Sequence, residues 1–272
     1  MPFSGLRVLT LESRKAKDME ALILREEGIP IVAPSVRERG LEDDQTGVYL
    51  VEQLEADVFD MIILMTGVGL GFLRDLVIPK MPVERFTAAL KRATIVARGP
   101  KPIVVLKQLG LQPDVVIGEP NTWKEIVAAV AERTERRIAV QEYGRPNAEM
   151  NSALERLGAT VTPFAIYRWE MPEDPEPLRA AAAALARGEC DVVLFTSSIQ
   201  LDHLLEAAGS LREGVELALR TKVVVASIGP VMTAALEGKG IKADIIPKHP
   251  KMWALVKAAA EQAQELLRTK RG

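Results

Sequence analysis

The sequence contains very few residues that could form disulfides or soft-metal sites. Among 272 residues there is one cysteine, Cys190, and there are two histidines, His203 and His249. A single cysteine excludes an internal disulfide, and this small set excludes a zinc cluster or a histidine-rich metal centre. Mg²⁺ held by carboxylates is the metal site that the composition leaves open.

The chain also lacks an excess of either charge and any long apolar run. The 35 Lys and Arg against 37 Asp and Glu leave a net charge of −2, which excludes a general basic field for nucleic acid or anionic lipid. The longest apolar run, Ala180–Ala186, has seven residues, whereas a membrane span needs roughly 20. Arg7, Glu12 and Arg14 interrupt the stretch that a signal peptide would keep apolar. We therefore expect a globular cytoplasmic protein that binds neither membrane nor nucleic acid.

An internal repeat is present, because the sequence matches itself at a shift of about 130 residues. Around residues 60–76 the shift becomes 131, which pairs Asp60 with Asp191 and Leu73 with Leu204. The other matched pairs are Gly28 with Gly158, Gly99 with Gly229, Leu106 with Leu236, Gly110 with Gly240, Asp114 with Asp244, Pro120 with Pro250 and Trp123 with Trp253. Since the chain has only three tryptophans, coincidence explains the last match poorly. We infer two homologous halves, about 1–130 and 131–272.

Short β-branched runs alternate with segments of helical period in both halves, which is typical of β-α units on a parallel sheet. The chain begins with an expected strand at Leu6–Leu11, Ser13 as helix N-cap, and a helix at Lys15–Glu27 that Gly28 ends. The further expected extended segments are Ile29–Val36, Met61–Met65, Thr94–Ala97, Val115–Ile117, Arg137–Gln141, Thr160–Arg168, Val192–Phe195, Val223–Ala226 and Ile245–Ile246. We predict an α/β protein of two similar doubly wound parallel-sheet domains, flavodoxin-like in size.

The best linkers by composition do not lie at the repeat boundary. They are the Asp-, Glu- and Gly-rich stretch Arg37–Gly47 and the proline-rich stretch Met171–Pro177. We therefore predict one domain over residues 42–163 and a discontinuous domain from residues 1–35 and 172–272. Residues 36–41 and 164–171 would cross between the domains as a two-strand hinge.

Four loops lead from expected strands into helix N-termini, where backbone N–H groups favour anions. They are Thr66-Gly67-Val68, Gly99-Pro100-Lys101, Thr196-Ser197-Ser198 and Gly229-Pro230. Any one of them could be an ordinary strand-helix turn, but together they are expected to face a common cleft. The run Thr66–Gly71 has the spacing G-x-G-x-G rather than G-x-G-x-x-G, so a nucleotide-dependent oxidoreductase has only weak support.

A few reactive side chains stand near these loops. Tyr167, in a crossing segment, could donate a phenolic proton or could simply stack in the hinge. Arg14 and Arg145 could clamp carboxylates or form ordinary salt bridges. Among the less reactive candidates, His203 is interpreted as a packed or exposed helix residue, His249 as a residue that could face the domain mouth, and Met150, Trp123 and Trp253 as core.

At these positions the chain resembles the uroporphyrinogen-III synthase family over essentially its whole length. The likeness lies in Arg14, Asp60–Gly67, Gly99-Pro-Lys, Leu154–Val161, Ile166-Tyr167-Arg168, Asp191–Ser198 and Ile228-Gly-Pro with Leu236 and Gly240. The resemblance implies two α/β domains joined by a two-strand hinge, and a monomeric enzyme of tetrapyrrole biosynthesis.

The implied reaction closes hydroxymethylbilane into uroporphyrinogen III with inversion of ring D and loss of water, and it uses no metal or organic cofactor. The implied catalytic acid is Tyr167, and hydroxymethylbilane synthase would supply the linear substrate with its eight carboxylates. The candidate substrate-binding residues are Arg14, Thr66, Gly67, Val68, Arg98, Gly99, Lys101, Tyr143, Gly144, Arg145, Thr196, Ser197, Ser198, Gly229, Pro230 and Thr233.

The chain departs from the family pattern at three loops. Pro102 and Met232 stand where the family often has a threonine, Thr233 is displaced by one residue, and Thr66-Gly67 replaces a Thr-Ser pair. These departures keep a second interpretation open, in which the protein is a non-catalytic sensor that binds a tetrapyrrole or another polycarboxylate.

Overall fold

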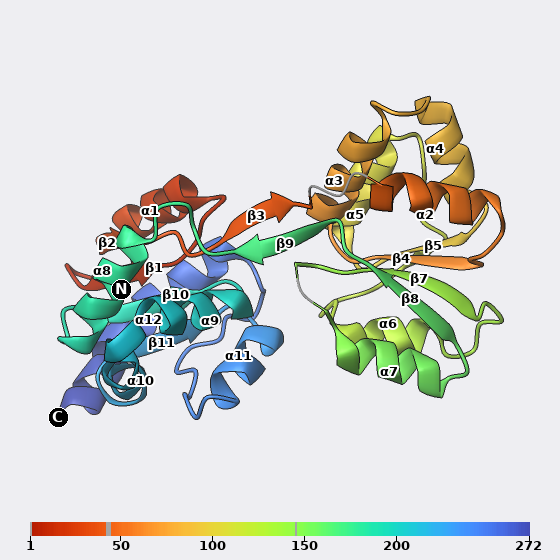
Figure 1. Cartoon of the computed structure of the whole chain (residues 1–272). Helices are drawn as coiled ribbons and strands as arrows, with labels where there is room; N and C mark the ends of the chain where they lie inside the picture. Colours follow the sequence, from red (N-terminus) through yellow and green to blue (C-terminus); the bar gives the residue numbers. More distant parts are fainter. Residues whose placement is uncertain (1, 42–44, 145) are drawn as a thin grey trace. The chain divides into compact units, whose positions relative to one another are not determined.

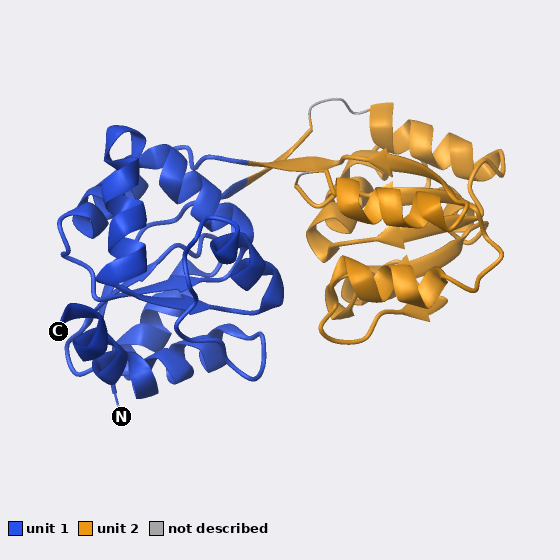
Figure 2. Ribbon diagram, turned by 90° about the horizontal axis from the view of Figure 1, so that it is seen from below, with its two compact units in different colours: residues 1–37, 170–272 blue, residues 38–169 orange. Residues whose placement is uncertain are grey.

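The structure is a computed structural model that describes residues 2–41, 45–144 and 146–272 as alternating helices and strands (Figure 1). Its contacts divide the chain into unit 1, Met1–Arg37 with Glu170–Gly272, and unit 2, Glu38–Trp169 (Figure 2). The points of division fall within the segments 36–41 and 164–171. Residues 42–44, at the start of the predicted second domain, lie outside the described residues.

Unit 2 contains a parallel sheet of five strands in the order β6-β5-β4-β7-β8. The strands are β4 (Met61–Leu64), β5 (Thr94–Ala97), β6 (Val115–Val116), β7 (Arg137–Gln141) and β8 (Thr160–Phe164). One face is covered by α2 (Gln45–Glu55), α3 (Gly67–Val77), α4 (Val83–Leu90) and α5 (Pro100–Gln108), and the other by α6 (Trp123–Val130) and α7 (Ala148–Arg156) (Figure 1). Alternate residues of β4 point to opposite faces, so Ile62 packs in one core cluster and Ile63 in the other.

Unit 1 is built on a second parallel sheet, in the order β11-β10-β1-β2. Its strands are β1 (Arg7–Thr10), β2 (Ile29–Val32), β10 (Val192–Phe195) and β11 (Val224–Ser227). The helices α8 (Glu176–Ala186), α9 (Ser198–Ala207), α10 (Arg212–Thr221) and α11 (Pro230–Glu237) pack on one face, and α1 (Ala16–Arg25) and α12 (Met252–Arg271) pack on the other. The predicted α/β class with parallel sheets is therefore confirmed.

The two sheets have the same internal register once the repeat shift is applied. Met61 pairs with Thr94 and Ile138 in unit 2, and Val192 pairs with Val224 and Val8 in unit 1. Residues 131 and 130 apart therefore occupy equivalent places, and β1 and β2 correspond to β7 and β8. The unit 1 strand that corresponds to β6 is reduced to a single parallel bridge between Ile245 and Ala226.

Where the chain passes between the units, β3 (Arg37–Gly40) and β9 (Tyr167–Glu170) form a separate two-stranded sheet. The predicted extended segment Ile29–Val36 thus ends as a strand at Val32, and Thr160–Arg168 divides into β8 and β9. That these two crossing strands act as a hinge stays a prediction.

The strand expected at Ile245–Ile246 is only an isolated bridge at Ile245, and two other local predictions were also wrong. Ser13 does not cap a helix: α1 begins at Ala16, and the Ser13 hydroxyl instead accepts hydrogen bonds from the N–H groups of Ser35 and Val36 at 3.1 and 2.9 Å. Trp253 is not core, because 51% of its surface is exposed. Both errors arise because a local pattern does not show which distant backbone group or helix face will be adjacent.

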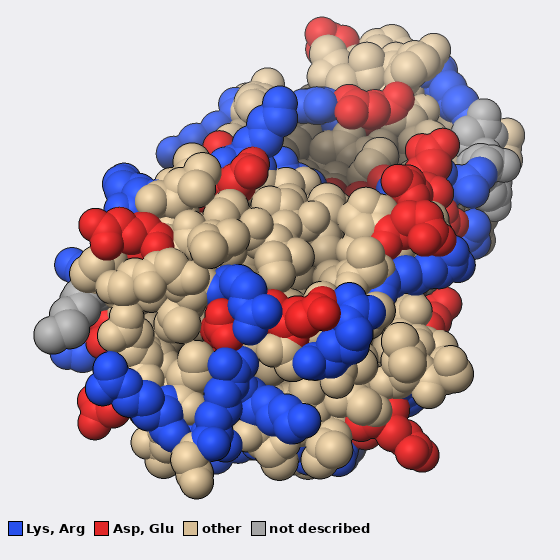
Figure 3. All heavy atoms as spheres, turned by 90° about the vertical axis from the view of Figure 1, so that its left-hand side faces the viewer, with Lys and Arg blue, Asp and Glu red and all other residues tan. Residues whose placement is uncertain are grey.

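Charges of both signs are interspersed on the face shown in Figure 3, in keeping with the near-zero net charge. Many of the charged side chains in the described chain form ion pairs near the surface, such as Arg212 with Glu216. Among the described residues, no helix is long and apolar enough to cross a membrane.

Candidate functional site

The clearest candidate site in unit 2 lies where β4 leads into α3. Thr66 is the N-cap of α3, and its hydroxyl accepts a hydrogen bond from the Gly69 N–H at 3.0 Å. The same hydroxyl lies 3.2 Å from the phenolic oxygen of Tyr167. Tyr167 is 2% exposed and its ring stacks on Phe72 with centroids 5.8 Å apart. The phenol is therefore held at a helix N-terminus, where developing negative charge is stabilised.

A glutamine from the neighbouring strand closes this loop. The Oε1 atom of Gln141, at the end of β7, accepts hydrogen bonds from the N–H groups of Met65 and Thr66 at 3.0 and 2.8 Å. These two N–H groups are thus satisfied within the protein. Anion binding at this loop would have to use Gly67 and Val68, which are both partly exposed.

A second group of candidate residues in unit 2 consists of an arginine and two aromatic residues whose side chains contact one another. The Arg98 guanidinium, after β5, lies 4.9 Å from the centroid of the Tyr143 ring, after β7. The Tyr143 ring in turn packs edge-to-face with the Trp169 ring of β9, with the ring centroids 5.8 Å apart. Gly144 can be only glycine here, because its φ is +81° and a Cβ would lie 2.3 Å from the Trp169 ring.

Arg98 has the properties of a carboxylate-binding group. Burial lowers the pKa of its guanidinium, and the nearby tyrosines Tyr143 and Tyr167 act in the opposite direction. Across residues 2–41, 45–144 and 146–272, no carboxylate forms an ion pair with Arg98. A desolvated cation without a protein counter-ion would gain from an anionic ligand.

The loop after β5 packs directly against the loop after β4. A Cβ on Gly67 would lie 2.6 Å from the backbone oxygen of Lys101, and a Cβ on Gly99 would lie 2.9 Å from Asn121. The structure thus brings two of the predicted loops into contact within unit 2. The Lys101 side chain is exposed, and Pro102, at a position where the family often has threonine, is buried.

In unit 1 the loop after β10 is occupied by the protein's own side chains. Gln200 accepts hydrogen bonds from the N–H groups of Thr196 and Ser197 at 2.7 and 3.2 Å, and it donates to the Thr196 hydroxyl at 2.8 Å. The Thr196 hydroxyl donates to Glu12 at 2.6 Å. A carboxylate therefore already lies where the sequence predicts an anion, and Ser198 is 7% exposed. This loop is less suited to a carboxylate ligand than the loops of unit 2.

The loop after β11 also satisfies its hydroxyls internally. Gly229 precedes α11, and the Thr233 hydroxyl donates to the Gly229 carbonyl at 3.1 Å and lies 2.9 Å from the Ser227 hydroxyl. Pro230 is exposed, and Met232 is buried in the core of unit 1.

The remaining candidates are dispersed. Arg14 is exposed beside α1, and Arg145 lies outside the described residues. His203 is buried, with Nδ1 2.6 Å from the Ser35 carbonyl oxygen, as a packed helix residue would be, whereas His249 is exposed. No group of three or more His, Cys, Asp or Glu residues able to hold a metal ion occurs in the described chain.

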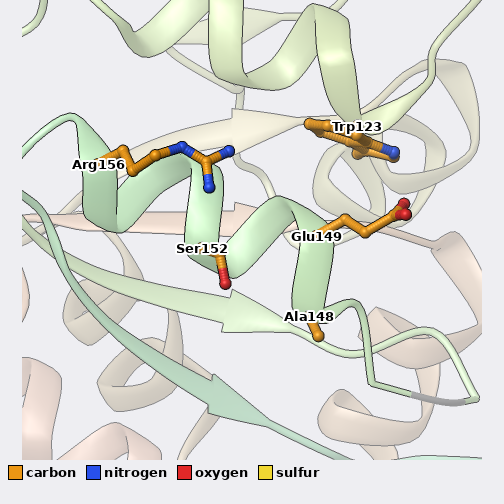
Figure 4. A pocket seen from close by; sticks show the side chains of 5 residues that line it. All are labelled: Trp123, Ala148, Glu149, Ser152 and Arg156. Atoms are coloured by element: carbon orange, nitrogen blue, oxygen red, sulfur yellow. The ribbon is translucent and has the colours of Figure 1, made fainter.

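The described residues of unit 2 form at least two surface grooves. One, of about 430 Å³, is lined by Trp123, Ala148, Glu149, Ser152 and Arg156 of α6 and α7, and it contains none of the predicted site residues (Figure 4). The other, of about 180 Å³, is lined by Arg39, Gly40, Leu41 and Arg168. The second groove includes Arg168, which is adjacent in sequence to the candidate acid Tyr167.

A sequence model of the family described as "Uroporphyrinogen-III synthase HemD" matches residues 17–257. The chain belongs to the uroporphyrinogen-III synthase family. The matched range includes Tyr167 and all the candidate substrate-binding residues except Arg14.

The chain is also similar to individual proteins. A crystal structure of a mutant uroporphyrinogen III synthase from Thermus thermophilus has a TM-score of 0.75 and 25% identity, and the match covers 96% of this chain and 100% of that one. A Bacillus subtilis (strain 168) protein named "Uncharacterized protein YjjA" is 28% identical over 96% of this chain and 97% of its own. A uroporphyrinogen-III synthase from Chlorobaculum parvum is 32% identical over 40% of this chain and 41% of its own.

Four residues that shape these loops were missed from the sequence, namely Gln141, Gln200, Trp169 and Glu12. Trp169 and Glu12 carry no local signal that sets them apart from other polar or aromatic residues. Gln141 did carry a signal in the repeat, because its equivalent in the other half is the apolar Leu11.

Proposed function

We propose that this protein is a uroporphyrinogen-III synthase, which closes hydroxymethylbilane into uroporphyrinogen III with inversion of ring D and release of one water. The observation that carries the proposal is the family match over residues 17–257. Such an enzyme is a lyase that acts on a small-molecule tetrapyrrole, and a hydroxymethylbilane synthase would supply its substrate.

Tyr167 is the catalytic acid in this proposal. The reaction begins when the terminal hydroxyl of the substrate leaves as water, so that hydroxyl needs a proton. The Tyr167 phenol can deliver the proton while Thr66, itself fixed by the Gly69 N–H, donates a hydrogen bond to the phenolic oxygen. The N-terminus of α3 then stabilises the negative charge that develops on that oxygen.

Arg98 is the principal carboxylate-binding residue in this proposal. Its guanidinium has no ion-pair partner among the described residues, and Tyr143 holds it in place by a cation–π contact. The loops Gly67-Val68 and Gly99-Pro100-Lys101 meet each other beside it and supply small residues at two helix N-termini. Tyr143 and Gly144 act mainly by shaping this site, and Arg14, Thr196, Ser197, Ser198, Gly229, Pro230 and Thr233 of unit 1 are secondary contacts.

The remainder of catalysis is conformational. Attack at the substituted α-carbon of the last ring must compete with simple closure, and a protein favours the former by holding the chain in the reactive geometry. We also propose that the protein acts as a monomer.

The test is a coupled assay in which hydroxymethylbilane, generated enzymatically, is fed to the purified protein. The uroporphyrinogens are oxidised, and isomers I and III are separated by chromatography. A predominance of isomer III over a control without the protein supports the proposal, whereas isomer I alone from a folded sample refutes it.

A polycarboxylate sensor of the same fold is the second candidate function. It is favoured by the internal use of the unit 1 loop, where Thr196 already pairs with Glu12. A sensor would bind hydroxymethylbilane or a uroporphyrinogen in a fluorescence titration while the isomer ratio stayed at its spontaneous value.

A further inference from the structure

In both repeats a glutamine accepts hydrogen bonds from two backbone N–H groups of the same loop, but the glutamine stands at a different position in each repeat. In unit 2, Gln141 Oε1 accepts from the N–H groups of Met65 and Thr66. In unit 1, Gln200 Oε1 accepts from the N–H groups of Thr196 and Ser197, which are the repeat equivalents of Met65 and Thr66 at a shift of 131. The same pair of backbone donors is thus satisfied by a strand residue in one unit and by a helix residue in the other.

The exchange is reciprocal. The unit 2 position equivalent to Gln200 is Gly69, and the unit 1 position equivalent to Gln141 is Leu11. A Cβ on Gly69 would lie 2.8 Å from both Cδ and Nε2 of Gln141, so a side chain at position 69 and Gln141 cannot coexist as they stand. Each repeat therefore holds one glutamine, and the partner position is the residue that leaves room for it.

In unit 2 the first turn of α3 therefore has no side chain at position 69, and the Tyr167 ring packs against the backbone there. A Cβ on Gly69 would lie 3.0 Å from Cε1 of Tyr167, closer than ordinary packing allows. The Nε2 atom of Gln141 has no hydrogen-bond partner among the residues that the structure describes, although Gln141 is 0% exposed. In unit 1 the corresponding Nε2 atom of Gln200 donates to Thr196 and to the Leu11 carbonyl.

We infer that Gln141 is a positioning residue for Tyr167: by holding the β4–α3 loop from the strand side, it allows position 69 to be glycine and the Tyr167 phenol to reach Thr66. Because Gln141 is 0% exposed, its assigned role is to act through Tyr167 and not on the substrate directly. The inference rests on the proposed function for the acid role of Tyr167, but the exchange of positions is independent of it.

The first experiment is a cycle of stabilities with Gln141→Leu, Gly69→Gln and the double variant, which recreates the unit 1 arrangement. Gln141→Leu leaves two N–H donors without an acceptor, and Gly69→Gln crowds Gln141, so each should lower the melting midpoint by about 5 °C. In the double variant the glutamine introduced on α3 can accept from the same two donors, so its midpoint should be at least as high as that of either single variant. If the losses in melting midpoint of the two single variants simply added in the double variant, the inference that the two glutamine positions are interchangeable would be overturned.

The second experiment separates positioning from structural support. The double variant should recover stability but keep a kcat at least tenfold below that of the original protein, with little change in KM, because the new side chain displaces Tyr167. A double variant with normal kcat would overturn the role assigned to Gln141.

Tyrosine NMR provides a readout that needs no substrate. The chain has three tyrosines, so ¹³C labelling of their rings gives few resonances, and Tyr167→Phe identifies the one from Tyr167. That resonance should move in Gln141→Leu and in the double variant, but it should stay in place in the matched control Gln200→Leu, which removes the equivalent bonds in unit 1. An unmoved Tyr167 resonance in all variants would refute the inference, whereas absence of isomer III from the original protein, with the NMR and stability results as expected, would refute only the proposed function.

Discussion

Asp191→Asn should destabilise unit 1 far more than its repeat equivalent, Asp60→Asn, destabilises unit 2. Asp191 accepts hydrogen bonds from the Arg7 N–H, Nε and Nη2 at 2.8, 3.0 and 3.0 Å, and it forms an ion pair with Arg271 at 3.0 Å. Asp60 accepts from the N–H and Nε of Arg137 at 2.7 and 3.2 Å. The aspartate side chains are 8% and 32% exposed, respectively, so the Asp191 carboxylate is more shielded from water than the Asp60 carboxylate, although the arginines that pair with Asp191 remain partly exposed.

The expected magnitudes follow from this difference. Asparagine keeps one acceptor oxygen but loses the charge and turns an amide toward the two arginines, which we expect to lower the free energy of unfolding by about 3 kcal/mol at pH 7. At Asp60 the partner arginine is 54% exposed, and the expected loss is about 0.5 kcal/mol.

The effect at Asp191 should depend on pH. Burial raises the pKa of Asp191, but the hydrogen bonds and charge of Arg7, together with the hydrogen bond from Arg271, outweigh burial, so the pKa is lowered overall from 3.8. A carboxyl group with a lowered folded pKa stabilises the protein above its unfolded pKa, and this contribution is lost as the pH falls through the folded pKa. The difference between Asp191→Asn and the original protein should therefore shrink below about pH 4.

Urea unfolding monitored by tryptophan fluorescence can measure each unit by itself. Replacing Trp123 and Trp169 by Phe leaves Trp253 to report on unit 1, and replacing Trp253 leaves the other two to report on unit 2. Equal losses for the two variants, or a difference that does not shrink in acid, would refute the argument from burial.

Three further outcomes are expected. Tyr167→Phe should lower kcat by tenfold to about a hundredfold while the melting midpoint stays within a few degrees, because the stacking on Phe72 remains; unchanged turnover would exclude the acid role. Arg98→Leu should raise KM by about tenfold or more, since a charge-assisted contact is lost, whereas the control Arg92→Leu removes an exposed pair with Asp57 and should leave KM unchanged; equal effects would contradict a carboxylate contact at Arg98. Cys190 should not react with a disulfide reagent at pH 8 until urea unfolds the chain, because burial raises its pKa to about 11; rapid reaction of the folded protein would show that this core opens.

The sequence predicted the central strands well because burial on both faces makes them continuous apolar runs. Met61–Leu64 and Val192–Phe195 are entirely buried, and the internal repeat correctly pairs them as equivalents. Predictions at element ends were poorer. Ser13 has the local pattern of an N-cap, yet its hydroxyl accepts from Ser35 and Val36, a contact that depends on β2 lying beside β1.

The sequence predicted which loops belong to the candidate site, but it did not predict how their side chains and backbone groups contact one another. Strand ends and helix starts pointed to Thr66, Gly99 and Thr196, because parallel sheets place such loops at one edge. Which N–H groups remain for a ligand could not be predicted, since this depends on side chains from other strands. Gln141 reaches Thr66 across 75 positions of sequence, and Glu12 reaches Thr196 across 184.

The position of β1 in its sheet constrains how the chain can fold during synthesis. β1 lies between β2 and β10, and Arg7 is 184 positions from Asp191, so β1 has no partner on one side until β10 has been made. Residues 38–169 meanwhile contain every strand of the five-stranded sheet. On the ribosome, unit 2 can therefore complete its core before β10 is made, so β1, α1 and β2 are translated before unit 2 but reach their final place after it.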